Sequence, residues 1–211
     1  MLDVADRTGT ARLRERNKQE KRDRILTAAR DLFGSQGFDA TTMQQVASAA
    51  RVAAGTLYLY ARTKQDLLVM VFVEELGAVV DDSFATLPED AGPLDALLHL
   101  YGAVVAHHAA NLSLSRPFAK ELMFVDNEHR PQMQTFMTAW RARIAEVLAR
   151  AQRRGELSPA TDTRLLAATS FGLFFYWMQS WVGGHLSRER FDEELPVVLT
   201  QLLTGHQTPA V

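Results

Sequence analysis

Two short helical patterns joined by a tight turn lie between residues 41 and 60, and no other feature constrains the fold of this chain as strongly. The first pattern opens at Thr41 or Thr42, whose hydroxyls can cap free backbone N–H groups. Its apolar residues recur at helical spacing, and they are Met43, Val46, Ala47 and Ala50. Val52 is expected to fill the space between the two helices, with Leu57 on the inner face of the second. The layout predicts a helix-turn-helix, whose second helix enters the major groove of DNA.

The residues left on the outside of the second helix suit contact with DNA. Gly55 lets the backbone approach another surface closely, and Thr56 and the tyrosines at 58 and 60 can hydrogen-bond to phosphate. An ordinary helical corner has the same shape, so the flanking segments matter. Upstream lies a helical stripe that ends at residues 34–38, and downstream residues 63–68 open another helix. The stripe consists of Ile25, Ala28, Ala29, Leu32 and Phe33.

With these flanking segments, the chain closely resembles the N-terminal domain of TetR-family transcriptional regulators over about residues 18–71. The residues that match are Ile25, Ala28, Ala29, Leu32, Phe33, Gly37, Phe38, Thr41, Thr42, Val46, Ala47, Ala50, Val52, Gly55, Thr56, Leu57, Tyr58, Tyr60, Lys64, Leu67 and Leu68. The resemblance implies DNA contacts, mostly to phosphate, from Thr42, Thr56, Tyr58, Tyr60 and Lys64, with Thr41 beside them. It leaves the exposed positions for base reading, which are Gln44, Gln45, Ala54, Gly55 and Leu59.

Three residues depart from the usual pattern of that family. Arg51 stands in the turn where glycine is common, and a residue with a side chain tolerates a positive φ angle poorly. Ala53 replaces the usual Ser or Thr cap of the recognition helix, a loss of about 1 kcal/mol in local helix stability. Ala61 replaces a common Phe after Tyr60. The fold is expected to survive all three, while the turn and its fine contacts are expected to differ.

Composition limits the classes of protein that need to be considered. The 211 residues contain no cysteine, which excludes disulfides and thiolate metal sites. The longest apolar stretch, residues 165–182, is interrupted by polar side chains, so no membrane span is predicted. The N-terminus lacks the apolar core of a signal peptide. A cytoplasmic protein that does not associate with a membrane is expected.

The charge is distributed unevenly along the chain, although its net value is only −2. Residues 1–68 contain 12 Lys and Arg against 8 Asp and Glu, whereas residues 69–211 contain 11 against 17. A basic N-terminal part is what phosphate binding requires. Within it, residues 1–17 carry Arg7, Arg12, Arg14 and Arg16 and few large apolar groups, which predicts a flexible basic arm. Such an arm can lie along DNA or serve only as a solubilising tail, and both alternatives remain open.

Beyond residue 64 the pattern is helical, with no convincing strand. Together with the first part it predicts an all-α chain of about nine helices, over 18–35, 42–49, 53–60, 64–85, 93–110, 117–126, 129–154, 161–183 and 190–204. The expected organisation is a flexible arm (1–17), a three-helix DNA-binding domain (18–78, with its motif at about 42–61), and a domain for effector binding and dimerisation (79–211). The helix over 64–85 connects the last two domains without a flexible linker.

Residues 165–182 are apolar on nearly every side, and a helix of this kind must be covered all round. Gly172 and Ala168 allow close helix approach, and the final helix adds a second apolar stripe around Leu195 and Leu199. The resemblance implies that the last two long helices pair with their copies in a homodimer. Two-fold symmetry would then place two recognition helices about 34–36 Å apart on a palindromic operator in double-stranded DNA. The alternative is a buried core helix in a monomer.

The middle of the chain is rich in aromatic and thioether side chains, as ligand pockets are. Most of these side chains are expected to be core, and the resemblance implies that a subset lines a cavity for a small apolar or aromatic effector. The candidates are His107, His108, Met123, Phe124, Phe136, Met137, Trp140, Phe171, Phe175, Trp177 and Met178, with Asn111 and Gln179 as further polar anchors.

No pattern in the sequence indicates an enzyme. His107 and His108 are adjacent, so on a helix they diverge by about 100°, and no phosphate-binding loop or nucleophile elbow is present. No catalytic residue, cofactor or metal site is therefore expected. The sequence predicts a ligand-responsive transcriptional repressor that an effector releases from its operator. The alternative is a DNA-binding regulator without a small-molecule effector, constitutive or architectural.

Overall fold

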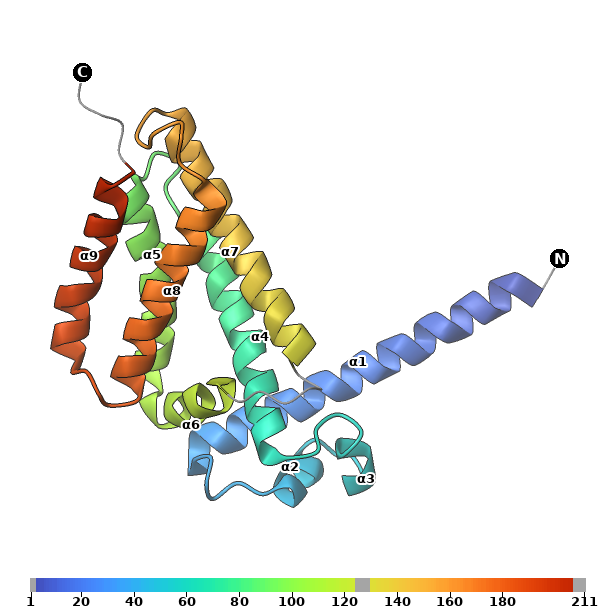
Figure 1. Cartoon of the computed structure of the whole chain (residues 1–211). Coiled ribbons are helices and arrows are strands. Elements are labelled where there is room, and N and C mark those ends of the chain that lie inside the picture. Colours follow the sequence, from blue (N-terminus) through green and yellow to red (C-terminus); the bar gives the residue numbers. More distant parts are fainter. Residues whose placement is uncertain (1–2, 124–129, 207–211) are drawn as a thin grey trace. The chain divides into compact units, whose positions relative to one another are not determined.

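The computed structural model describes residues 3–123 and 130–206, and every regular element in these ranges is a helix (Figure 1). This confirms the all-α prediction. The chain divides into two compact units, Met1–Phe72 and Val73–Val211. None of the described helices is long and apolar enough to cross a bilayer.

The first unit contains α1 (Asp3–Gln36), α2 (Met43–Ala49), α3 (Ala54–Leu57) and the first turns of α4 (Lys64–Ala85). The predicted apolar stripes form its core, since Ile25, Phe33, Val46, Leu57 and Leu67 are all at most 1% exposed. α1 packs on α2, and α2 packs on α3. The core thereby fixes the turn between α2 and α3.

The segment expected to be a flexible arm is helical, because α1 begins at Asp3 and not near residue 18. Its sequence is rich in Ala, Arg, Glu, Lys and Gln, which lose little conformational freedom in a helix. Arg16 and Glu20 also form an ion pair at i, i+4, with Nε 3.3 Å from Oε1. The sequence of this segment has few apolar residues, and an irregular backbone was predicted from that. A low apolar content does not by itself prevent a helix.

The second unit contains the rest of α4 and five further helices, α5 (Pro93–Ala110), α6 (Leu112–Met123), α7 (Arg130–Arg153), α8 (Thr163–Val182) and α9 (Arg188–Thr204). α8 is central, since it contacts α5, α6, α7 and α9. Phe174, Leu148, Leu100 and Leu199 are fully buried around it. Figure 1 shows α8 running alongside α9 and α7 in this unit.

The prediction for α6 was wrong at its N-terminal end. A break was expected over residues 111–117 because of Pro117, but α6 begins at Leu112 and contains this proline. Ser115 explains the early start: its N–H donates to Asn111 O at 3.0 Å, and its buried hydroxyl donates to the same oxygen at 3.0 Å. These bonds fix the first turn before Pro117 is reached, and a proline near a helix start removes few backbone hydrogen bonds.

Candidate nucleic-acid interface and apolar cluster

A capping box begins α2 and takes up one of the side chains expected to read bases. Thr42 accepts a hydrogen bond from the N–H of Gln45 at 3.2 Å, and Gln45 Oε1 accepts one from the N–H of Thr42 at 2.8 Å. Gln36 Nε2 also donates to Gln45 Oε1 at 3.2 Å. Gln44 is exposed and makes no side-chain hydrogen bond within the described residues. Gln44 is therefore the better candidate for base reading.

Arg51 stands in the turn after α2 at the position where glycine is common. Arg51 takes the left-handed conformation itself, with φ of 55°. The N–H of Arg51 donates to Ser48 O at 3.1 Å, and the N–H of Val52 donates to Ala47 O at 3.0 Å. The arginine thus carries conformational strain.

The recognition helix is shorter than predicted, since α3 ends at Leu57 and single turns follow it to residue 60. At the start of α3, Ala53 offers no side-chain acceptor to the first N–H groups, as the sequence predicted. Beyond the helix, Leu59 is 83% exposed and Tyr58 is 51% exposed. Together with Ala54 and Gly55, which are also exposed, they form the outer face of the motif; Thr56 is half-buried.

Three residues expected to touch DNA have structural partners inside the first unit. Thr41 is only 1% exposed and donates to Gly37 O at 2.8 Å, so its assignment to the DNA surface is corrected: burial removes it from reach. Lys64 Nζ donates to Phe38 O at 2.7 Å and to Asp39 O at 3.0 Å. The hydroxyl of Tyr60 donates to a carbonyl of α1 at 3.2 Å. Lys64 and Tyr60 therefore fasten the motif to α1 and to the loop after it.

In the second unit, aromatic side chains from α5, α7 and α8 form one cluster. The rings of Tyr101 and Phe174 stack with centroids 4.3 Å apart. Trp140 meets Phe171 edge-on at 5.1 Å, and Phe136 lies 6.0 Å from Trp140. Phe175 joins through Phe171 at 6.3 Å. The structure thus brings together four of the effector candidates, which are Phe136, Trp140, Phe171 and Phe175.

Tyr101 and Ser170 were not among the candidates, yet they form the buried polar pair of this cluster. Their hydroxyl oxygens lie 2.9 Å apart, and each residue is 0% exposed. Burial raises the pKa of the Tyr101 phenol above its usual value, with the bond to Ser170 opposing the shift. The phenol therefore stays neutral. The only signal in the sequence was a tyrosine on the inner, apolar face of its helix.

The two candidate histidines lie at the C-terminal end of α5 and contact α6 and α4. His108 is 1% exposed, and its Nδ1 lies 2.9 Å from Ser115 Oγ. Burial, followed by the adjacent His107, lowers the pKa of His108 to about 4, so that the ring is neutral near pH 7. His107 Nε2 lies 3.4 Å from Glu75 Oε2 on α4. These histidines link α5 to α6 and to α4.

The remaining candidates have different environments. Met178 is buried, and Met137 and Trp177 are half-buried. The side chain of Met123 and all of Phe124 lie outside the described residues. Three buried polar atoms have no hydrogen-bond partner within the described part of the chain, namely the indole nitrogens of Trp140 and Trp177 and the amide oxygen of Gln179. Such atoms need an explanation, and a ligand with polar atoms would supply partners for them.

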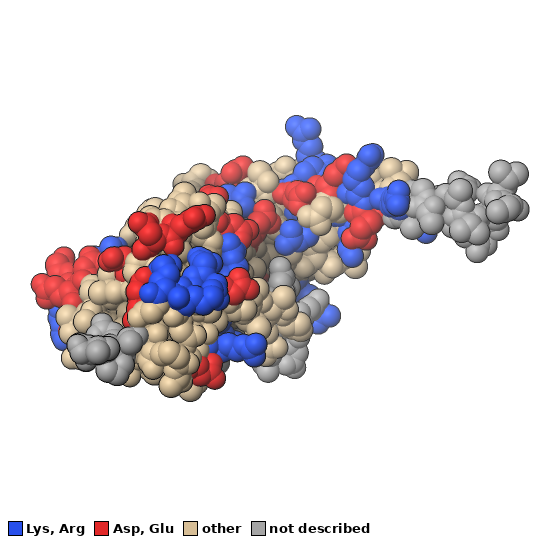
Figure 2. Space-filling view, turned by 90° about the horizontal axis from the view of Figure 1, so that it is seen from above, with Lys and Arg blue, Asp and Glu red and all other residues tan. Residues whose placement is uncertain are grey.

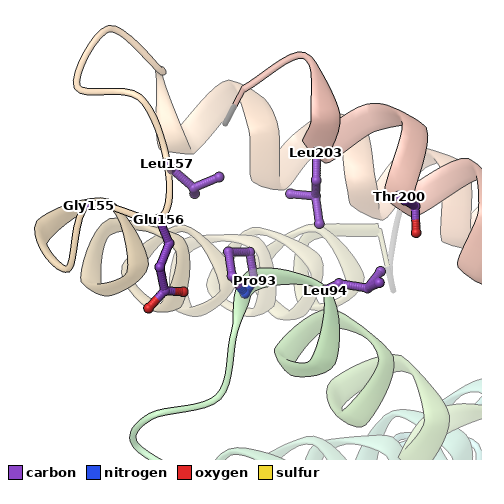
Figure 3. Close-up of a pocket in the computed structure, with 7 residues that line it drawn as sticks. All are labelled: Pro93, Leu94, Gly155, Glu156, Leu157, Thr200 and Leu203. Carbon is purple, nitrogen blue, oxygen red and sulfur yellow. The ribbon is translucent and has the colours of Figure 1, made fainter. Parts of the chain in front are cut away.

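A cavity of about 320 Å³ opens in the second unit between the start of α5 and the end of α9 (Figure 3). Leu94, Leu157 and Leu203 point toward one another across it, and Glu156 lies at its side. The sequence did not predict this cavity, because the segments that line it are far apart in the chain. Among the described residues, no group of three or more His, Cys, Asp and Glu could hold a metal ion.

Two family models match this chain. The model for bacterial regulatory proteins of the tetR family covers residues 25–71, and the model for the tetracyclin repressor-like C-terminal domain covers residues 88–195.

Three relatives illustrate the similarity along the chain. It is 24% identical to the "Fatty acid metabolism regulator protein" of Bacillus subtilis, covering 84% of this chain and 90% of that protein. It is 25% identical to the HTH-type transcriptional repressor KstR of Mycobacterium tuberculosis, covering 92% and 84%. The crystal structure of Thermus thermophilus FadR in complex with lauroyl-CoA is similar with a TM-score of 0.72 and 26% identity, over 90% of this chain and 97% of that one.

Proposed function

Because the chain belongs to the TetR family of bacterial regulatory proteins, we propose that it is a homodimeric repressor released from a palindromic operator by an acyl-CoA thioester. The observation that carries the choice of effector is the similarity over nearly the whole chain to a repressor solved with lauroyl-CoA. DNA binding is supported by the exposed outer face of the helix-turn-helix, to which Tyr58 and Leu59 contribute directly after α3. As a regulator of transcription it acts in the cytoplasm.

The interior of the second unit has the chemistry that an acyl thioester requires. An acyl chain needs an apolar wall, which Phe136, Phe171 and Phe175 provide. A thioester carbonyl needs a hydrogen-bond donor, and the buried N–H of Trp140 has no acceptor among the residues that the structure describes. Leaving a buried donor unsatisfied costs about 1–3 kcal/mol, so a carbonyl placed there gains affinity and specificity.

The exposed face of α8 supports the homodimer. Leu165 is 65% exposed and Tyr176 is 62% exposed, with Ala168 and Gly172 between them on the same face. On α9, Val197 is 54% exposed. Adjacent apolar exposure on two long helices marks an interaction surface, and small residues allow the close approach that helix pairing requires. A second copy of the chain is the proposed cover.

α4 is the element that can carry the effector signal, since it begins in the first unit and ends in the second. Several side-chain contacts hold the second half of α4 against α5 and α7. His107 pairs with Glu75, Arg143 forms an ion pair with Asp81, and His99 Nε2 lies 3.0 Å from Ser83 O. Effector binding that moves α5 or α7 would move α4 with them. A coupling free energy of about 1–3 kcal/mol would change operator affinity about 5–150-fold.

The test has two steps. Selection of random duplex DNA by the purified chain at about 0.15 M salt should enrich an inverted repeat, which then serves as a fluorescent probe. Lauroyl-CoA should release the protein from this probe, whereas CoA, acetyl-CoA and lauric acid at the same concentration should not.

Each negative result rejects a different part of the proposal. If none of the four compounds releases the DNA, acyl-CoA thioesters are rejected as the effector class. If no small molecule that is tried releases the DNA, the constitutive alternative is favoured. A selected site without two-fold symmetry would contradict the dimer.

A further inference from the structure

The exposed part of α1 carries a basic stripe on the side that faces the helix-turn-helix. Arg14, Lys18 and Lys21 precede Ile25 by eleven, seven and four residues. At 3.6 residues per turn, these spacings return to within about 40° of the direction of Ile25. Ile25 is 0% exposed in the core of the first unit, where α1 packs on α2. The stripe therefore extends the inner face of α1 beyond the core.

A hydrogen bond connects the middle of this stripe to the helix-turn-helix. The hydroxyl of Tyr60 donates to the backbone carbonyl of Lys18 at 3.2 Å. Tyr60 follows the exposed residues Tyr58 and Leu59 directly along the chain. The basic stripe is thus continuous with the surface that reads DNA.

The charges of the stripe are available for an outside partner. Arg14, Lys18 and Lys21 are exposed, and the structure gives them no ion pair within its described residues. On the opposite side of the same helix, Arg16 is paired with Glu20. Figure 2 shows Lys and Arg side chains interspersed with Asp and Glu on the face that it presents. From Arg14 to Lys21 the helix rises about 10 Å, a length over which duplex DNA presents several phosphates.

We propose that this stripe of α1 binds the phosphate backbone of DNA outside the sequence that the recognition helix reads. The inference rests on the proposed DNA binding and adds a second, sequence-independent contact to it. The helical extension then acts as a rigid arm that lengthens the footprint of each protomer. The partner is recognised by its charge alone, since the stripe offers no apolar group or acceptor for base edges.

The experiment compares two triple variants with the full-length wild type. R14Q/K18Q/K21Q removes the stripe, and the matched control R12Q/R16Q/R24Q removes three cations from other faces of the same helix. Glutamine keeps a helix propensity close to that of Lys and Arg, and circular dichroism verifies that both variants are folded. The probes are duplexes carrying the inverted repeat that the wild type selects, with flanks of 2 or 12 base pairs.

The stripe variant should lower the slope of log affinity against log salt by about 2–3, because each phosphate contact contributes about 0.9. The control should lower it by less than about 1. Shortening the flanks should weaken the wild type and the control several-fold and leave the stripe variant unchanged. Equal slopes for the two variants, or equal flank dependence, would overturn the inference while DNA binding stands. A wild type that selects no sequence would overturn the proposed function and this inference together.

Discussion

The imidazole Nε2 of His107 lies 3.4 Å from Oε2 of Glu75, and this contact joins α5 to the part of α4 that belongs to the second unit. Both side chains are about a quarter exposed or less. Glu75 belongs to α4, and this helix continues from there to Lys64 in the first unit. The pair therefore ties α5 to the helix that connects the two units.

His107→Ala should reduce the release of operator DNA by effector without changing operator affinity in its absence by more than about two-fold. The reason is that the substitution loosens α5 from α4 and leaves the recognition helix untouched. Titration of the bound probe with lauroyl-CoA measures both quantities. The control is Asp82→Asn, which neutralises an exposed carboxylate on α4. This variant should release DNA on addition of lauroyl-CoA as the wild type does. Full release by His107→Ala would exclude this contact as a coupling element.

The two neighbouring glutamines of α2 should separate stability from sequence reading. Gln45→Ala removes half of the capping box and should lower the free energy of unfolding by about 1 kcal/mol. Gln44→Ala should change stability by less than about 0.5 kcal/mol and alter the bases enriched in the DNA selection. Urea unfolding and repeated selection give the two readouts. If Gln45→Ala alters the selected bases and Gln44→Ala does not, the side chain of Gln45 leaves the capping box to contact DNA in the complex.

Arg51→Gly should stabilise the chain. A left-handed residue with a side chain costs about 1–2 kcal/mol, and the greater freedom of glycine in the unfolded chain returns about 0.5–1 kcal/mol of this. The expected gain is therefore about 0–1.5 kcal/mol, measured as a rise in the calorimetric midpoint. Ala49→Gly, at the exposed end of α2, is the control and should destabilise. A lower midpoint for Arg51→Gly would show that the arginine side chain makes a compensating contact.

His108 should make stability depend on pH below neutrality. Its pKa falls from 6.5 to about 4 on folding, so between these values the unfolded state binds more protons and stability declines as pH falls. The shift corresponds to a loss of at most about 3 kcal/mol. Urea midpoints at pH 7.5, 6 and 5 measure it.

His108→Gln should flatten this part of the stability profile, because glutamine does not titrate. His185→Gln, at an exposed histidine, is the control and should leave the profile unchanged. An unaltered slope in His108→Gln would assign the effect to other groups.

Leu165→Glu should dissociate the proposed dimer, because it places a charge at the N-terminal end of the exposed apolar face of α8. Light scattering after size exclusion should report one chain in place of two, and binding to the inverted repeat should fall together with dimerisation. Leu13→Glu is the matched control, since Leu13 is 50% exposed on α1 and lies outside that face. If Leu165→Glu remains dimeric, the dimer interface does not include this face of α8.

The helical stripes fixed most element boundaries in advance. The helices over 64–85 and 93–110 were predicted to the residue, because each has an apolar face and a clear start and stop. The start of α6 was missed because it depends on Ser115, whose partners at 108 and 111 are set by packing. The helical state of residues 3–17 was missed because this segment of the sequence has no apolar periodicity.

For the DNA-reading motif, residue types and spacing were sufficient to place the turn and the two helices, since capping hydroxyls and helical periodicity are local properties. They were not sufficient to decide which of the polar side chains predicted to be exposed remain available to contact DNA. Thr41, Gln45 and Lys64 are committed to partners within the first unit, and only the folded chain brings those partners into reach.

The amino-acid sequence by itself determined the helical class, the position of the reading motif and the aromatic content of the second unit, because each follows from local composition and period. The tertiary structure decided which side chains meet: Tyr101 with Ser170, His107 with Glu75, and Tyr60 with the backbone of Lys18. These pairs are separated by 69, 32 and 42 positions in the chain. No local pattern encodes such contacts, since they exist only when several apolar faces are buried at the same time.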